Sequence, residues 1–286
     1  MKNTMRLIPV IMFLGACTME EPISEFLDDQ STEPGLVVES IFTNKAVVQQ
    51  VKLTFSQTAG ELNDEAVPVE GANLLITGND QEYVLLEVKP GIYETEGPVK
   101  GEIGQRYTLR IEYQGNIYEG SDMLEPIASH QPIELVMEID GFYSIPFRPH
   151  QFGYEEPNRY NLSVFIPDSL WTENFENVTK NRIWTYYTHP FFEPNGVFEF
   201  VATDYKTFGE HTYYLRQKKY SISDSYYDYL RALFSETEWR GSLLDSNPGK
   251  IPTNLVNLSK GNSAGIMGFF ATCATDELIY KYPDRE

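Results

Sequence analysis

A five-residue stretch near the C-terminus carries the pattern of a catalytic nucleophile. Gly261-Asn262-Ser263-Ala264-Gly265 matches G-x-S-x-G, the motif in which a serine between a strand and a helix attacks an acyl group. That chemistry requires a helix after the serine and a histidine later in the chain. The residues that follow are the β-prone run "IMGFFATC", and no histidine follows Ser263. We therefore expect a glycine-rich turn here, with a triad in another order as the open alternative.

The other residue types that catalyse reactions or bind metals are scattered. No H-E-x-x-H, C-x-x-C, phosphate-binding or dinucleotide-binding motif occurs, so we expect no metal and no cofactor. The chain has 42 acidic residues, and some of them form carboxylate pairs by chance. A glycosidase-type pair can therefore be neither located nor dismissed from the sequence. The four histidines are His130, His150, His189 and His211.

Cys17 has the sequence context of a lipid attachment site. Two basic residues precede the apolar run Leu7–Leu14, which is shorter than the ~20 residues of a membrane span and is typical of a cleaved signal. Leu14-Gly15-Ala16-Cys17 then fits the lipobox of bacterial lipoproteins. We expect removal of residues 1–16 and acylation of Cys17, which anchors a protein stably when two or more chains are attached. An ordinary secretory signal with a cysteine at the cut site is the alternative.

Acidic residues follow Cys17 closely. Glu20 and Glu21 resemble the export signal that sends lipoproteins of Bacteroidota to the cell surface; a plain acidic tether is the alternative. Residues 17–34 are rich in Glu, Asp, Ser and Pro, so we expect a flexible tether. The second cysteine, Cys273, is distant from the first, and we expect it to be a buried thiol rather than half of a disulfide.

Composition limits the class of protein. The chain has 286 residues, of which 41% are hydrophobic and 14% aromatic, enough for one large or two ordinary domains. The formal net charge is −20. A field of that sign repels phosphates, so we expect no nucleic-acid partner and no contact with the membrane except through the N-terminal lipid.

Short alternating segments separated by turn signals predict an antiparallel β-sandwich over residues 35–128. Gly78-Asn79-Asp80, Pro90-Gly91 and Gly115-Asn116 are such signals. The expected strands are Leu36–Thr43, Val47–Ser56, Ala72–Thr77, Glu82–Val88, Ile92–Gly97, Gln105–Tyr113 and Asn116–Asp122.

Residues 129–286 predict a second β-rich domain, which contains one amphipathic helix. The helix is expected over residues 223–239, where five large side chains recur at helical spacing and Ser223 or Asp224 could cap the first turn. We expect it to lie across a sheet; a partner-binding helix is the alternative. Ala264–Tyr282 is expected to form a buried strand and a terminal strand. The other expected strands are Ile133–Ile139, Arg159–Ile166, Val197–Thr203 and His211–Ser221.

Two further segments are candidates for function. Asp168-Ser169-Leu170 resembles a short O-glycosylation site, with Ser169 as the acceptor. Asn181–Gly196 combines aromatic residues with polar residues and prolines, so these aromatics either fill a core or hairpin or form a ligand or partner surface. They are Trp184, Tyr186, Tyr187, Phe191 and Phe192.

Several stretches in order resemble one family. They include "LVVESIFT", "VPVEGANLLI", "GEIGQRYTLRIEYQGNIYEG", "SYYDYLRAL", "IPTNLVN" and "GIMGFFATC". The chain resembles the Bacteroidota surface lipoproteins of domain-of-unknown-function family 4249. The resemblance implies a mainly β fold, with an immunoglobulin-like or carboxypeptidase-regulatory-like sandwich before the β-rich domain. It also implies an outer-membrane location beside SusC-like TonB-dependent transporters, and it carries no catalytic residues.

Two classes of function follow from these expectations. The first is a non-enzymatic, lipid-anchored module at the cell exterior that binds a TonB-dependent β-barrel or another outer-membrane complex. The second is a surface hydrolase with an unrecognised carboxylate site, and an adhesin is a further alternative.

Overall fold

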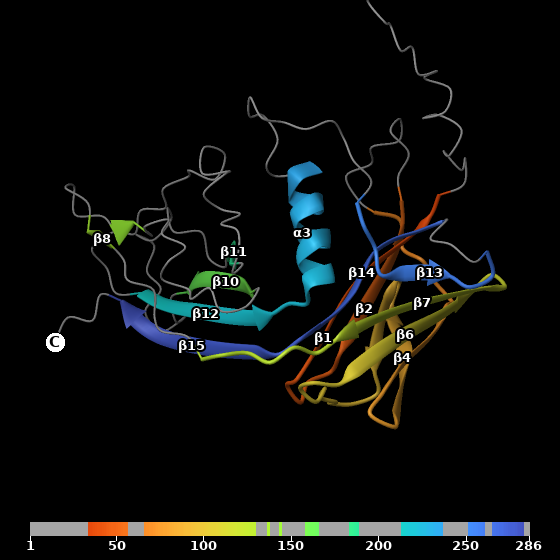
Figure 1. Ribbon diagram of the computed structural model, residues 1–286, viewed down its shortest axis with the longest axis horizontal. Coiled ribbons are helices and arrows are strands. Elements are labelled where there is room, and N and C mark those ends of the chain that lie inside the picture. The colour runs from red at the N-terminus through yellow and green to blue at the C-terminus, as the bar shows by residue number, and fades with distance from the viewer. Residues whose placement is uncertain are drawn as a thin grey trace, which may run out of the picture. The chain divides into compact units, whose positions relative to one another are not determined.

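Two β-sheets account for most of the structure, a computed structural model (Figure 1). The residues from Pro34 to Glu286 form one compact unit. The structure describes residues 34–56, 66–129, 136–137, 143–144, 158–165, 183–188, 213–236, 251–260 and 265–282.

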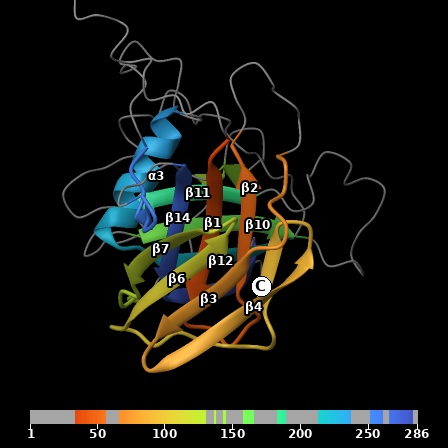
Figure 2. The same ribbon diagram turned by 90° about the vertical axis from the view of Figure 1, so that its right-hand side faces the viewer.

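The larger sheet has nine strands. Their bounds are β1 (Leu36–Thr43), β2 (Gln50–Phe55), β3 (Asn73–Gly78), β4 (Gln81–Lys89), β5 (Ile92–Thr95), β6 (Arg106–Tyr113), β7 (Asn116–Met123), β13 (Leu255–Asn257) and β14 (Ile266–Cys273). The order across the sheet is β13-β7-β6-β3-β4-β5-β2-β1-β14. Neighbours are antiparallel except β1 and β14, which are parallel. In Figure 2 the strands β7, β6, β3 and β4 lie in front of β14, β1 and β2.

The smaller sheet has the order β11-β10-β12-β15 and is antiparallel throughout. A separate pair joins β8 to β9. The bounds are β8 (Val136–Met137), β9 (Tyr143–Ser144), β10 (Asn158–Phe165), β11 (Ile183–Thr188), β12 (Tyr213–Ser221) and β15 (Thr275–Tyr282). The helix among the described residues is α3 (Asp224–Glu236). The structure thus confirms the mainly β class with one amphipathic helix; the immunoglobulin-like detail stays a prediction.

Alternation of apolar and polar residues explains why these segments are strands. In β6 the side chains of Tyr107, Leu109 and Ile111 are buried at every second position, as a sheet with one face in a core requires. Two tight hairpins use left-handed residues, as their turn type demands. Asn79 and Asp80 have φ of 50° and 55° between β3 and β4.

The second tight hairpin lies between β6 and β7. The turn signal in the sequence is Gly115-Asn116, but the left-handed pair of the turn lies one residue earlier. Gln114 and Gly115 take φ of 47° and 77°, and Asn116 is already the first residue of β7, paired with Tyr113. The hairpin itself is confirmed.

Strands β13 and β14 come from the region that was expected to form a separate C-terminal domain. Both lie in the same sheet as the N-terminal strands. β14 pairs with β1 along its whole length, from Leu36 opposite Ile266 to Thr43 opposite Cys273. The pattern of either segment alone does not indicate this pairing, because strand alternation is a local property.

Side chains tie the two ends of the larger sheet together. The Asn254 amide donates to the carbonyls of Ser121 and Phe270, at 3.0 and 2.8 Å, and accepts from the Phe270 N–H at 3.1 Å. The Asp122 carboxylate, on β7, accepts from the N–H of Thr272, on β14, at 2.8 Å. Strand β14 therefore has β1 on one side and the region of β7 on the other.

Helix α3 begins where the sequence predicts. The Ser223 hydroxyl accepts from the N–H of Tyr226 at 3.1 Å, which is an N-cap hydrogen bond. Tyr226 and Tyr229 have ring centroids 5.0 and 5.1 Å from that of Phe269, on β14. The expected packing of the helix on a sheet is confirmed, and residues 237–239 of the expected helix lie outside the described part of the chain.

Two apolar clusters among the described residues hold these elements. The first fills the larger sheet and contains Val38, Phe42, Tyr93, Tyr107 and Leu109 among others. The second lies between β14 and α3 on the outer face of that sheet, with Ile41 packed against it. Its buried members are Tyr220, Ile222, Tyr226, Tyr227, Leu230, Phe269, Ala271 and Cys273.

Candidate functional site

The predicted N-terminal and glycosylation sites lie outside the described residues. Cys17, Glu20, Glu21 and Ser169 are in this group, so lipidation, the export signal and O-glycosylation stay predictions. Phe191 and Phe192 also lie outside.

The remaining predicted aromatics are in a strand. Trp184, Tyr186 and Tyr187 belong to β11, at one edge of the smaller sheet. In register, Trp184 is opposite Leu162 and Tyr187 is opposite Arg159. Trp184 and Tyr186 take alternate positions, which belong to one face of a sheet, and Tyr187 takes a position on the other face. The choice between a core and a partner surface for these aromatics stays a prediction.

The G-x-S-x-G motif precedes a strand. Ser263 lies outside the described residues, but Gly265 is in a turn with φ of 74° and β14 follows directly. The strand–serine–helix context that positions a nucleophile in the elbow is therefore wrong here, as the sequence predicted.

Cys273 is a free, buried thiol, which confirms the expectation. Burial raises the pKa of this thiol well above its ordinary value, and the charge of Asp122 raises it further. A neutral thiol is a poor nucleophile and a poor metal ligand, so Cys273 acts as a core residue.

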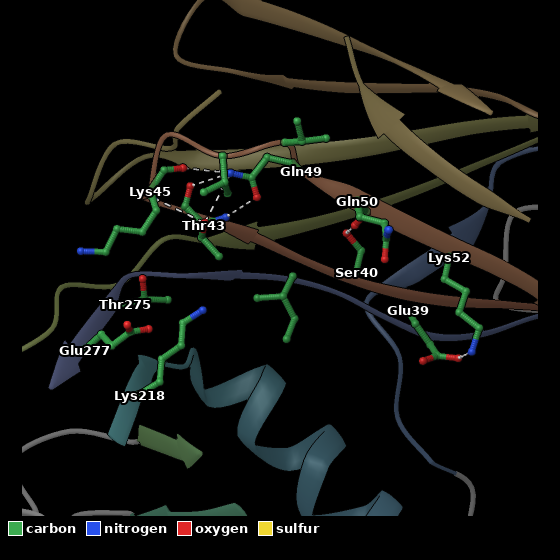
Figure 3. Close-up of a pocket in the computed structure, with 13 residues that line it drawn as sticks. Glu39, Ser40, Thr43, Lys45, Gln49, Gln50, Lys52, Lys218, Thr275 and Glu277 are labelled. Atoms are coloured by element: carbon green, nitrogen blue, oxygen red, sulfur yellow. Dashed lines mark hydrogen bonds and ion pairs between the residues drawn. The ribbon is translucent and has the colours of Figure 1, made fainter. Parts of the chain in front are cut away.

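An open groove of about 790 Å³ is a feature that the sequence did not indicate (Figure 3). Its lining comes from β1, from the connection between β1 and β2, from the start of β2, and from the facing strands β12 and β15. The volume is in the usual range of small-ligand sites, about 300–1,000 Å³.

A buried glutamine shapes one wall of the groove. Gln49 is 3% exposed, and its side chain donates to the carbonyls of Val99 at 2.9 Å and Lys45 at 3.2 Å. Its amide oxygen accepts from the N–H of Thr43 at 3.1 Å, and its own N–H donates to the Thr95 hydroxyl at 3.0 Å. These bonds satisfy the backbone of the connection and fix its path.

The wall formed by β15 is held to the first wall by the same connection between β1 and β2. The Asn44 side chain accepts from the N–H of Thr275, the first residue of β15, at 2.8 Å. The N–H of Asn44 donates to the carbonyl of Cys273 at 3.3 Å. One residue thus holds the β1–β2 connection against the start of β15.

Both acidic residues of the lining are already neutralised by partners. Glu39 pairs with Lys52 at 2.9 Å, and Glu277 lies 3.8 Å from Arg216. Burial, followed by the charge of Glu39, raises the pKa of the Tyr229 hydroxyl.

Two lysines of the lining have no such partner. Among the described residues no ion pair involves Lys45 or Lys218. The Lys218 amine lies 4.9 Å from the centroid of the Tyr220 ring, a contact that orients the side chain without neutralising it. Figure 3 shows the Lys218 amine directed into the groove, above Glu277 and beside Thr275.

The chemistry of the lining suits non-covalent binding. Its hydroxyls are engaged with nearby amides and backbone groups: the Ser40 hydroxyl with the carbonyl of Gln50 at 3.3 Å, and that of Thr275 with the Asn44 amide at 3.4 Å. Neither hydroxyl has a basic side chain bonded to it, which nucleophilic catalysis requires.

A family model described as "Domain of unknown function (DUF4249)" matches residues 20–279. The chain belongs to this family. The match confirms the resemblance that the ordered sequence stretches indicated, over nearly the same part of the chain. No curated protein and no solved structure gives a match.

Sequence reasoning missed the residues that build the groove of this DUF4249 chain. Gln49 was expected to lie within a strand over Val47–Ser56, whereas β2 begins at Gln50; Lys45 lies before the expected strand. A glutamine within an apolar run was the available signal, because a buried amide needs partners. Lys218 gave no signal, since a lysine in an alternating strand is ordinarily solvated.

The described ranges contain neither a metal-binding cluster nor a membrane-spanning helix. Within the described ranges of the DUF4249 chain, no group of three or more His, Cys, Asp or Glu residues lies together as a metal site. Within the same ranges, no helix is long and apolar enough to cross a membrane.

Proposed function

We propose that this DUF4249 protein is an outer-membrane lipoprotein that works by binding, as the accessory partner of a TonB-dependent β-barrel of the SusC type. Cys17 carries the lipid, the acidic residues after it direct the protein to the cell exterior, and the β-structured unit engages ligand and barrel. The lipobox and the family resemblance support the location and the partner.

The groove carries the proposal of a binding role. Its walls are held by a buried amide and by a side-chain bond between segments distant in the chain. A site that is fixed before the ligand arrives loses little conformational entropy on binding. Its lining offers amines, hydroxyls and exposed valines rather than a nucleophile with a base.

Affinity purification of the full chain from its own membranes tests the proposal. The protein, tagged at its C-terminus, is extracted in mild detergent and its partners are identified by mass spectrometry. We expect a TonB-dependent barrel in near-stoichiometric amount. Recovery of the protein without any barrel would overturn the proposed partnership.

A Cys17→Ala variant is the matched control for the anchor. It should lose incorporation of labelled palmitate and leave the membrane fraction, because the lipid supplies the membrane affinity. Labelling that persists in the variant would place the lipid elsewhere.

A further inference from the structure

We propose that the groove binds an acidic peptide segment, with Lys45 and Lys218 contacting its carboxylates and Val47 and Val48 contacting its aliphatic side chains. The inference names the ligand class of the site and rests on the binding role proposed above.

Charge in the groove is the first reason. Glu39 and Glu277 face Lys52 and Arg216, so the acids of the lining are compensated from within the protein. Lys45 and Lys218 make no ion pair with a described acid, although Glu277 is opposite Lys218 in the β12–β15 register. The described lining has three lysines against two acids, so its net charge is positive, and a ligand that completes it is negative.

The charge of the whole chain sharpens this preference. With a formal net charge of −20, the surface as a whole repels an acidic ligand, and repulsion suppresses binding at other places. An acidic ligand is therefore attracted to the groove, where the two lysines lie, and is repelled from the rest of the surface.

The apolar part of the lining favours a peptide over a sugar polymer. Val47 and Val48 are 45% and 44% exposed, and no aromatic residue is among the described residues of the lining. Sugar rings pack on flat aromatic faces, whereas aliphatic side chains of a peptide pack on valines. An acidic segment with aliphatic residues matches both features.

The connection that carries three of these four residues is held in one conformation. The Gln49 amide binds the carbonyl of Lys45 at 3.2 Å, and Val47 exchanges backbone hydrogen bonds with Val99 at 3.3 and 2.9 Å. The amine and the valines are thus presented together, which favours an extended ligand of matching spacing.

Fluorescence anisotropy tests the inference with labelled Glu-Val-Glu-Val-Glu-Val and the purified full chain in detergent. We expect saturable binding that weakens as NaCl rises from about 0.05 M to about 0.5 M, because salt screens exposed charges. Gln-Val-Gln-Val-Gln-Val should bind at least about tenfold more weakly. Equal binding of the two peptides overturns the inference.

Charge reversal locates the site. A Lys45→Glu/Lys218→Glu variant should lose at least about tenfold in affinity for the acidic peptide and gain affinity for Lys-Val-Lys-Val-Lys-Val. The gain of a new ligand shows that the variant is folded. The control variant Lys89→Glu/Lys260→Glu changes the net charge by the same amount at exposed positions outside the lining. It should bind the acidic peptide like the wild type. An equal loss of affinity in this control would show that the peptide does not bind in the groove.

Three more outcomes test the ligand class and separate this inference from the proposed function. Lysine-dependent binding of oligogalacturonate without binding of the acidic peptide would overturn the peptide assignment in favour of an acidic glycan. If the barrel co-purifies but the peptide does not bind, the partnership stands and this inference falls. If the peptide binds but no barrel is recovered, the inference stands and the partnership falls.

Discussion

At the scale of single residues, Gln49 contributes both to the stability of the fold and to the shape of the groove. Its buried amide bonds to backbone groups of Thr43, Lys45 and Val99, where the chain passes from β1 to β2. Removing such an amide leaves several buried backbone groups without partners, and each one costs about 1–3 kcal/mol.

Gln49→Ala should therefore lower the free energy of unfolding by about 3 kcal/mol and weaken binding in the groove. Gln50→Ala is the matched control, because its amide donates to Glu94 at the surface; exposed changes of this kind stay within about 0.5 kcal/mol. Urea denaturation of both variants measures the difference. Equal stabilities would show that the connection does not depend on Gln49.

Asp122 is the buried acid of the fold, 2% exposed. Burial raises the pKa of its carboxyl above the ordinary value, although hydrogen bonds from Thr272, Ser223 and Met123 act in the opposite direction. A raised pKa in the folded state means that the folded protein binds this proton more tightly than the unfolded chain. Its contribution is thus fully present below the unfolded pKa of about 3.9 and is lost as the pH rises through the folded pKa.

Compared with Asp122→Asn, the wild type should lose stability as the pH rises from about 4 through the folded pKa of Asp122. The asparagine variant lacks the titration and serves as the reference. Chemical denaturation of both proteins across this range measures the difference. A wild type that gains stability over the same range would show that the hydrogen bonds outweigh burial.

At the scale of elements, the parallel pairing of β1 and β14 depends on one glycine. Gly268 has φ of 86°, and a Cβ at this position would lie 2.0 Å from the Val38 carbonyl oxygen on β1. That backbone conformation and that close approach both exclude a side chain.

Gly268→Ala should lower the free energy of unfolding by about 3 kcal/mol or more, because the strain at positive φ and the backbone clash both destabilise the variant. Gly265→Ala is the matched control: its φ is 74°, but a Cβ there meets no atom within 4 Å, so only the conformational cost of about 1–2 kcal/mol remains. Thermal unfolding of the two variants checks the order. A Gly265 variant at least as unstable as the Gly268 variant would contradict the packing argument.

A feature of the fold could be predicted from the sequence where its cause is local. The alternation in β6, the turn at Asn79 and Asp80 and the Ser223 cap have local causes and were predicted. The pairing of β1 with β14 depends on segments at opposite ends of the chain. The groove was missed for the same reason, because Lys45 and Lys218 line one groove only once that pairing and the smaller sheet have formed.

At the scale of the whole molecule, the residues predicted to direct the protein to the cell surface lie in the segment before the β-structured unit. Glu20 and Glu21 follow the predicted lipid site closely, and other acidic residues, such as Asp28 and Asp29, follow further along. An export signal acts only at a fixed position relative to the lipid. The effect of a plain acidic tether depends instead on the total charge of the segment.

Glu20→Ala/Glu21→Ala should therefore leave the protein lipidated but no longer digestible by protease added to intact cells. Asp28→Ala/Asp29→Ala removes the same charge and should leave the protein exposed to the protease. Digestion followed by immunoblotting of both variants decides between the two explanations. Equal digestion of both would favour the plain tether.

The tie between Asn44 and Thr275, 231 residues apart in the chain, has a consequence for export. A chain that crosses a membrane from its N-terminus delivers β1 long before β14, so one edge of β1 is without its partner for most of the passage. Exposed strand edges pair with other chains, and contacts of long range form slowly. Export of the chain as a lipoprotein, the location proposed above, would therefore call for a holding chaperone that releases the chain only when its last strands have arrived.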